Sequence, residues 1–186
     1  GIAGDWLWLP MRADGAYVVT GGLGGLGLSV AGWLVERGAS HLVLAGRSGA
    51  GTPEKQAAVQ ALRDQGAAVT VLAEDVSDAD ACARIIAAAP DLRGVIHAAG
   101  TLDDGVILQQ SPSRFRHVMG PKAGGAWNLH QLTKDLDLDM FVMYGSAAGL
   151  LGSPGQSNHA AANTFLDGVA HHRRRLGLPG ICIDWG

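Results

Sequence analysis

Short apolar runs alternate with longer amphipathic stretches along this chain of 186 residues. The alternation is typical of βαβ units whose parallel strands are buried on both faces. The apolar runs predict six strands at about 16–20, 41–45, 68–72, 94–98, 140–144 and 180–184. The stretches between them predict helices at about 25–37, 53–65, 78–88, 121–135 and 156–176. Right-handed crossovers then predict an α/β fold, a Rossmann doubly wound parallel sheet with helices on both faces.

A glycine-rich turn follows the first predicted strand and opens the first predicted helix. Gly22, Gly24 and Gly27 fit the spacing G-x-G-x-x-G. Glycine is needed there because a side chain would block the approach of the backbone to a pyrophosphate at the helix N-terminus. A merely flexible turn is the alternative, but strand, glycines and helix occur in the required order. The predicted phosphate cradle comprises Thr20, Gly21, Gly22, Leu23, Gly24, Gly25, Leu26 and Gly27.

The end of the second predicted strand bears on the choice of cofactor. An NAD site usually places Asp or Glu there, to accept from the ribose 2′-hydroxyl. This chain has Arg47 and Ser48 instead, and a guanidinium can pair with the oxygens of a 2′-phosphate. NADPH is therefore favoured over NADH, with a solvated loop charge as the alternative role of Arg47.

Two further turns follow predicted strands, at the edge where open α/β sheets bind ligands. Asp75 and Val76 follow the third strand, and His97, Ala98, Ala99 and Gly100 follow the fourth. We expect adenine contact and cofactor support from these residues. His97 alone is weak support, because a single histidine at a strand end is more often structural.

Composition narrows the class of function. Apolar residues make up 47% of the chain and charged residues 17%, as in one globular domain with a sizeable core. The formal net charge of −3 gives no basic field for nucleic acid or an anionic membrane. Cys82 and Cys182 lie inside a predicted helix and a predicted strand, which argues against a disulfide framework. No apolar run is long enough to span a membrane. We therefore expect a cytoplasmic protein that binds a small molecule, without a metal.

Several segments together resemble the ketoreductase domains of modular type I polyketide synthases, which belong to the short-chain dehydrogenase/reductase superfamily. The matching segments are 20–27, 97–100, 121–130, 145–149 and 154–163, and the resemblance covers about 16–186. It implies NADPH-dependent reduction of a β-keto group on an acyl chain carried by the phosphopantetheine arm of an acyl carrier protein. It also implies other synthase domains in the same polypeptide.

The resemblance implies a catalytic set of Lys122, Ser146 and Asn163. A carbonyl that accepts hydride develops negative charge on oxygen, so it needs a hydrogen-bond donor such as Ser146 and a nearby proton donor. The charge of Lys122 would lower the pKa of an adjacent phenol. Taken singly, Lys122 could be a surface lysine in a first helical turn and Ser146 a turn former.

His159 stands where the family pattern places the tyrosine that acts as general acid. A cationic Lys122 nearby would favour neutral imidazole, which is a far poorer acid than imidazolium. The ring is also shorter than a phenol by about 2 Å, and such misplacement can reduce proton transfer about a hundredfold. We expect impaired reduction with a retained fold. A naturally inactive domain, an engineered substitution and a reductase that recruits His159 or water all remain open, as do a non-catalytic module and an epimerase.

Leu102, Asp103 and Asp104 resemble the fingerprint of B-type ketoreductases, which give the D-configured β-hydroxyl. Leu151 stands where the opposite group tends to carry tryptophan. Two aspartates that cap a loop are the alternative.

The ends of the chain and one charge run complete the expectations. Residues 1–15 are expected to be a linker or the edge of a missing structural subdomain, with an exposed apolar surface around Trp6 and Trp8. Residues 16–186 are expected to be the catalytic domain, without its lid and last strand. The run 173–175 of three arginines is expected to be a solvated face near a helix C-terminus.

Overall fold

All six predicted apolar runs are strands in the computed structural model, which describes residues 11–185. The strands are β1 Ala16–Thr20, β2 His41–Ala45, β3 Ala68–Leu72, β4 Leu92–His97, β5 Met140–Ser146 and β6 Ile181–Trp185. They pair in parallel in the order β3-β2-β1-β4-β5-β6. The strand order reverses between β1 and β4, so the predicted doubly wound Rossmann sheet is confirmed.

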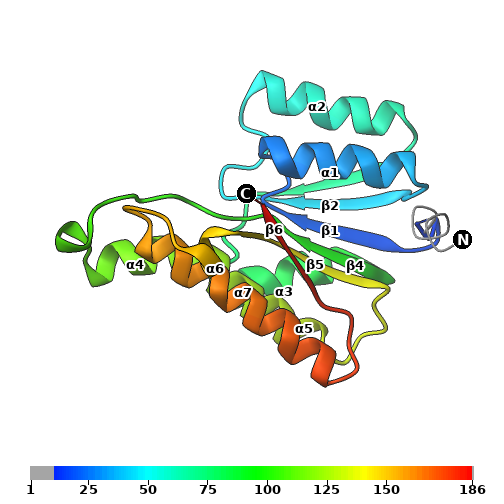
Figure 1. Ribbon diagram of the computed structural model, residues 1–186. Coiled ribbons are helices and arrows are strands. Elements are labelled where there is room, and N and C mark those ends of the chain that lie inside the picture. The colour runs from blue at the N-terminus through cyan, green and yellow to red at the C-terminus, as the bar shows by residue number, and fades with distance from the viewer. Residues whose placement is uncertain (1–10, 186) are drawn as a thin grey trace, which may run out of the picture.

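The five predicted helices cover both faces of this sheet (Figure 1). Helices α1 Gly25–Glu36 and α2 Pro53–Asp64 lie on one face; α3 Ala79–Ala87, α5 Gly125–Thr133 and α7 Ser157–Arg175 lie on the other. Local sequence sets their starts. Thr52 caps α2, where its hydroxyl accepts from the backbone N–H of Lys55, and Asp78 caps α3 in the same way.

Three short elements were not predicted: the 3₁₀ turn η2 Ile107–Gln109, helix α4 Pro112–Met119 and helix α6 Ala148–Leu151. The helix predicted from about residue 121 is present, and its first turn is the π-helical turn η3 Gly120–Gly124. Because α4, η3 and α5 are contiguous, the helix expected from about residue 121 begins at Pro112. The sequence carries a start signal there, since Ser111 caps α4 and proline occupies its first position.

The apolar core lies on both faces of the sheet. Successive side chains of a strand point to opposite faces, so Val18 of β1 packs towards α5 and α7, whereas Val19 packs towards α1 and α2. Both residues are fully buried, as is Phe141 of β5. Burial on both faces explains why these strands are continuous apolar runs rather than alternating ones.

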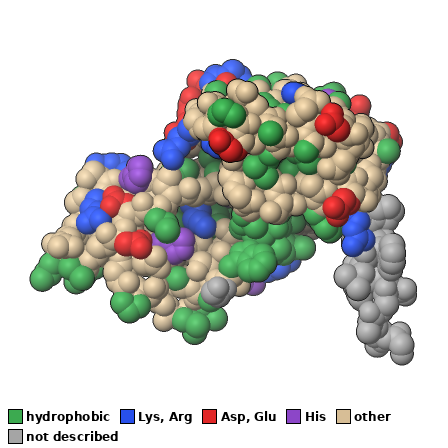
Figure 2. Space-filling view, turned by 90° about the horizontal axis from the view of Figure 1, so that it is seen from above, with side chains coloured by type: hydrophobic (Ala, Val, Ile, Leu, Met, Phe, Trp, Pro, Cys, Tyr) green, Lys and Arg blue, Asp and Glu red, His purple; other side chains and the backbone are tan. Residues whose placement is uncertain are grey.

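The layer of α1 and α2 does not extend over the whole sheet. A groove of about 410 Å³ lies beside α1, over β4, β5 and β6, and its lining is mostly apolar. Trp33 of α1 and Trp185 of β6 are partly exposed along it. Hydrophobic side chains are visible next to the α1–α2 layer in Figure 2. The expected apolar surface around Trp6 and Trp8 lies outside the described residues. Among the described residues, no helix is long and apolar enough to cross a membrane.

Arg173 corrects the expectation of a solvated arginine face. Its side chain is fully buried, and the guanidinium lies over the ring of Phe141 at 3.9 Å from the centroid. Its Nε donates to the carbonyl oxygen of Pro179 at 2.6 Å, and Nη1 faces Nδ1 of His130 at 3.2 Å. Position 173 continues the inward face of α7 formed by residues 166, 169 and 170. Helical periodicity, not the local run of charge, decides its place. The neighbouring Arg174 and Arg175 are exposed.

Candidate functional site

A cleft of about 470 Å³ opens at the carboxyl ends of the strands, where the strand order reverses. Open α/β sheets bind ligands at this point. Most of the residues predicted for cofactor binding line the cleft: Gly21, Leu23, Gly24, Gly25, Arg47, Ser48, Asp75, Val76, Ala98, Ala99 and Gly100. Of the others, Leu26 lines the apolar groove beside α1 instead. Thr20, Gly22, Gly27 and His97 are buried beneath the cleft.

The glycine turn fits a pyrophosphate. A Cβ on Gly27 would overlap the carbonyl oxygen of Gly21 and come within 2.6 Å of the Cα of Gly22. Gly21 has φ +66°, and a Cβ there would lie 2.6 Å from the carbonyl oxygen of Ala98. By contrast, Gly25 has open space around its Cβ position and lines the cleft. No side chain caps the start of α1 and its first turn holds no acidic residue, so its N–H groups are free to bind an anion.

The side of the cleft beyond β2 is cationic. Arg47 and Ser48 line this side, and so does Lys55 in the first turn of α2, whose Nζ lies 3.4 Å from Oγ of Ser48. Sequence reasoning missed Lys55, although a lysine in the helical turn after Arg-Ser was the available signal. Glu74 also lines the cleft, but Arg84 holds its carboxylate with two hydrogen bonds of 2.7 Å. Its negative charge is thereby partly neutralised.

His97 joins the end of β1 to the segment that carries Lys122. Its Nε2 lies 2.8 Å from the carbonyl oxygen of Lys122, which can only accept, so Nε2 carries the proton. Nδ1 then accepts from the hydroxyl of Thr20 at 2.7 Å. Burial lowers the pKa of His97 to about 4, and the charge of Lys122 acts in the same direction. His97 is thus a neutral structural link beneath the cofactor cleft.

Lys122 is buried rather than on the surface. It lies in the π-helical turn η3, which holds more residues per turn than an α-helix, and its side chain is 8% exposed. Nζ donates to the carbonyl oxygen of Tyr144 in β5 at 3.0 Å. Burial lowers the pKa of Lys122, while Cys182 and Asp184 act in the opposite direction.

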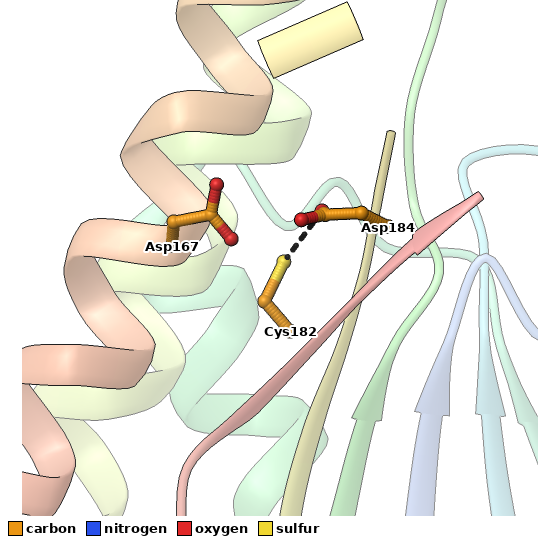
Figure 3. A group of neighbouring side chains, drawn as sticks. All are labelled: Asp167, Cys182 and Asp184. Atoms are coloured by element: carbon orange, nitrogen blue, oxygen red, sulfur yellow. Dashed lines mark hydrogen bonds between the residues drawn. The ribbon is translucent and has the colours of Figure 1, made fainter. Parts of the chain in front are cut away.

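Asp167, Cys182 and Asp184 gather where α7 crosses β6 (Figure 3). Each offers a possible ligand atom, and these atoms lie within 4.8 Å of one another. Cys182 Sγ lies 3.5 Å from Oδ1 of Asp184, and burial raises the pKa of the thiol, with both carboxylates adding to the effect. A neutral thiol is a weak metal ligand. Burial lowers the pKa of Lys122, and the carboxylate of Asp184 partly raises it again.

Ser146, His159 and Asn163 come from β5 and the first two turns of α7. Ser146 Oγ accepts from the backbone N–H of Ala148 at 3.2 Å, which leaves its proton available to another acceptor. Asn163 is fully buried and donates to the carbonyl oxygen of His159 at 2.8 Å, while its Oδ1 has no described partner. Burial lowers the pKa of His159, and Lys122 lowers it further while Asp104 opposes them. The expected neutral imidazole is therefore supported, with burial as the larger cause.

The segment Leu102–Asp104 lies beside the start of α7. Leu102 is 61% exposed, whereas Asp103 forms an ion pair of 2.6 Å with Arg114 of α4. Asp104 accepts from the side-chain amide of Gln156 at 3.0 Å. Both carboxylates thus bind side chains of neighbouring segments, Arg114 of α4 and Gln156 before α7.

A doubly wound sheet with a glycine cradle, beside a buried lysine and a serine at the end of β5, defines the dinucleotide-binding class of short-chain dehydrogenases. A putative short-chain alcohol dehydrogenase from Sinorhizobium meliloti shares the fold, with a TM-score of 0.81 at 24% identity over 93% of this chain and 72% of that one. The family model of the KR domain matches residues 15–186, and the chain belongs to this ketoreductase family of polyketide synthases. Members of the family generally bind NAD(P)H.

Named relatives agree with this assignment. Mycoketide-CoA synthase of Mycobacterium tuberculosis is 48% identical over all of this chain, which spans 4% of that protein. Polyketide synthase GfsA of Streptomyces halstedii is 46% identical over all of this chain, which spans 2% of it. The first ketoreductase of the tylosin polyketide synthase superposes with a TM-score of 0.88 at 43% identity, covering 92% of this chain and 38% of that one. The chain is therefore similar to a small part of much longer synthases.

Proposed function

We propose that this chain is the NADPH-binding catalytic part of a ketoreductase domain whose reductive step is impaired at His159. The substrate is a β-ketoacyl group on the phosphopantetheine arm of an acyl carrier protein. NADPH would supply the hydride. The single observation that carries the proposed impairment is the lowered pKa of His159, which keeps the imidazole neutral where the family has a phenol.

The cofactor preference rests on charge. Arg47, Ser48 and Lys55 line one side of the cleft. The nearby carboxylate of Glu74 accepts two hydrogen bonds from Arg84, which partly neutralises its charge. A 2′-phosphate would meet cationic and hydroxyl donors at this side. The backbone at Gly24 and Gly25, which line the cleft at the start of α1, would bind the pyrophosphate, and Gly25 leaves open space for it. These features support NADPH over NADH.

The chemistry of the chain's own residues is binding and proton supply. Ser146 would donate to the substrate carbonyl oxygen, on which negative charge develops. Lys122, held by the carbonyl oxygen of Tyr144, places positive charge next to the proton donor. That charge would favour ionisation of a phenol at position 159 but disfavours imidazolium at the same position. The same site thus suits tyrosine and weakens histidine as an acid.

Stereochemistry and surroundings are part of the proposal. The B-type outcome, a D-configured hydroxyl, rests on Leu102, Asp103 and Asp104, whose segment borders the turn that carries His159. The proposed setting is a cytoplasmic multidomain synthase in which residues 1–15 link this catalytic unit to a preceding structural subdomain. A module that binds cofactor without turnover is the second candidate, and the neutral imidazole of His159 favours it.

The test compares the chain with its His159→Tyr variant, each extended to the length of the solved ketoreductases that it matches. NADPH oxidation is followed with a β-ketoacyl thioester, and NADPH binding is measured alongside by fluorescence. We expect equal binding in both and turnover at least about a hundredfold faster in the tyrosine variant. Comparable turnover in the two would refute the impairment. Binding without turnover in either would establish the non-catalytic module, and no binding would refute the cofactor site.

A further inference from the structure

The N-cap residue of α7 does not cap the helix with its side chain. Gln156 occupies the N-cap position, yet its side chain makes no capping hydrogen bond, and the first turn contains no acidic residue. The side-chain amide of Gln156 instead donates to Asp104. A helix start without a cap frays unless other groups hold it. His159 lies in this first turn, so its position depends on Asn158 and on contacts from outside the helix.

The segment Asp103–Gly105 supplies these contacts. Asn158 is fully buried, and its Nδ2 donates to the carbonyl oxygen of Asp103 at 2.8 Å. Its Oδ1 accepts from the backbone N–H of His159 at 2.8 Å. The backbone N–H of Gly105 also donates to the carbonyl oxygen of Gly155 at 2.8 Å. Asn158 therefore connects the backbone of this segment directly to the backbone of His159.

Arg114 holds the same segment from the opposite side. Its Nε and Nη2 both donate to Oδ1 of Asp103, at 2.8 and 2.6 Å, and Nη2 also donates to the carbonyl oxygen of Asp104 at 2.5 Å. Nη1 reaches the carbonyl oxygen of Gln109 at 3.1 Å. One guanidinium thus holds both the irregular backbone of residues 103–105 and the end of the 3₁₀ turn η2.

Glycine at position 105 makes room for this guanidinium. A Cβ on Gly105 would lie 2.5 Å from Nη1 of Arg114 and 3.0 Å from its Cζ. The side chains of Arg114 and Asp103 are 27% and 29% exposed, so the pair is partly shielded from water. Shielding and the planar fork make this pair more effective in fixing geometry than a solvated surface pair.

We propose that Arg114 is a positioning residue that sets the place of His159, acting through Asp103 and Asn158. That position 159 is the place of the proton donor rests on the proposed function. The series of contacts from Arg114 through Asp103 and Asn158 to His159, here called the brace, does not rest on it. The described hydrogen bonds of Arg114 reach neither His159 nor the residues that line the cofactor cleft. Its effect is transmitted by two charge-assisted hydrogen bonds, a segment of backbone and one buried amide.

The first test is amide hydrogen exchange in the 186-residue chain, comparing Arg114→Met with Arg116→Met. Arg116 lies on the same helix with an exposed side chain, so it matches the loss of charge and the local helix propensity. Loss of the charge-assisted bonds should speed exchange of the His159 and Gly105 amides about tenfold or more, and leave the amides of β1 unchanged. Arg114→Lys, which retains the charge without the fork, should lie between the two.

A second readout separates positioning from general destabilisation. The imidazole of His159 is titrated by NMR, with His130 as the internal reference because burial also lowers its pKa. The charged groups that act on His159 are Lys122 and Asp104. In Arg114→Met the turn opens to water, so the pKa of His159 should rise towards its ordinary value while that of His130 stays fixed. Asp103→Asn should reproduce this change, and the double variant should add nothing to it.

Exchange and titration at His159 that match the Arg116→Met control would overturn the proposal, whatever the enzyme does. If both readouts change but the His159→Tyr variant shows no turnover, the positioning role of Arg114 is supported and the proposed reductase function is refuted. Equal shifts at His159 and His130 would also overturn it, because the effect would then be global.

Discussion

Three glycines of α1, Gly25, Gly27 and Gly32, allow a test of how closely α1 packs against the turn before it. In Gly27→Ala the new Cβ would overlap the carbonyl oxygen of Gly21 and lie 2.6 Å from the Cα of Gly22. Ordinary carbon contacts are about 3.5–4.0 Å, so the backbone would have to move by about 1 Å. Gly32→Ala on the same helix has nothing within 4 Å of its Cβ. The two variants therefore differ in steric overlap and not in chemistry.

The expected magnitudes have opposite signs. Overpacking costs about 1–3 kcal/mol, whereas replacing an interior helical glycine by alanine stabilises by about 0.5–1 kcal/mol. Gly27→Ala should thus be about 2–4 kcal/mol less stable than Gly32→Ala. For a domain of this size the difference is about 5–15 °C in Tm. Thermal unfolding by circular dichroism, checked by urea unfolding, measures it.

A third variant separates the fold from the cofactor. Gly25→Ala also meets open space, but its methyl group would project into the cleft at the start of α1. It should unfold at the temperature of the parent or above it and bind NADPH more weakly, whereas Gly32→Ala should bind normally. Equal stability of Gly27→Ala and Gly32→Ala would show that Gly27 does not lie as close to the preceding turn as described. If Gly25→Ala bound NADPH as tightly as the parent, the anion site at α1 would be wrong.

Three further outcomes are expected. Lys55→Gln should weaken NADPH binding about three- to tenfold and NADH binding much less, measured by fluorescence titration, and equal losses for both would exclude a contact with the 2′-phosphate. The pKa of His97 falls from 6.5 to about 4 on folding, so its contribution is complete above about pH 6.5 and is lost as the pH falls towards 4. Urea unfolding should show about 3 kcal/mol lost over that range, and His97→Gln should lack this part of the pH dependence. Arg173→Ala should destabilise by about 3 kcal/mol or more, because it leaves acceptors unpaired and a void over Phe141, while the exposed Arg175→Ala should stay within about 0.5 kcal/mol of the parent in the same assay.

Periodicity predicted the strands and long helices because a buried parallel strand needs a continuous apolar run, and both sheet faces here are largely covered. The short elements escaped for the opposite reason. Segments such as α6 are too brief for a helical period to show, and tertiary contacts hold them. Arg173 was misjudged because its neighbours are charged, although its spacing from Leu166 places it inward.

The candidate site divides in the same way. The glycine turn could be predicted from sequence, because the local backbone geometry requires glycine at these positions. Lys55 carried only the weak signal of a lysine in the helical turn after Arg-Ser, and the role of Arg114 could not be predicted, because its long side chain reaches Asp103 and Asp104 in backbone of irregular conformation. The role of His97 also needed the register, since Thr20 and His97 are paired across β1 and β4. Only that pairing brings the two side chains within hydrogen-bond reach.

The direction of the Lys122 side chain depends on the number of residues in the π-helical turn at Gly120–Gly124. Upstream, α4 buries Val118, and downstream, α5 buries Ala126 and Leu129, so both ends are fixed against the core. Removing one residue from this turn would let it relax to regular α-geometry with α4 and α5 still in phase, because a π-helical turn holds about one residue more than an α-helical turn. The residues within the turn would then change direction by up to roughly 100°, so the ammonium of Lys122 would face elsewhere, whereas a deletion inside α4 or α5 would rotate one helix against the core. An insertion or deletion in this short stretch should therefore be far less tolerated than almost any substitution in it, and a scan of single-residue deletions through 112–133 would map the constraint directly.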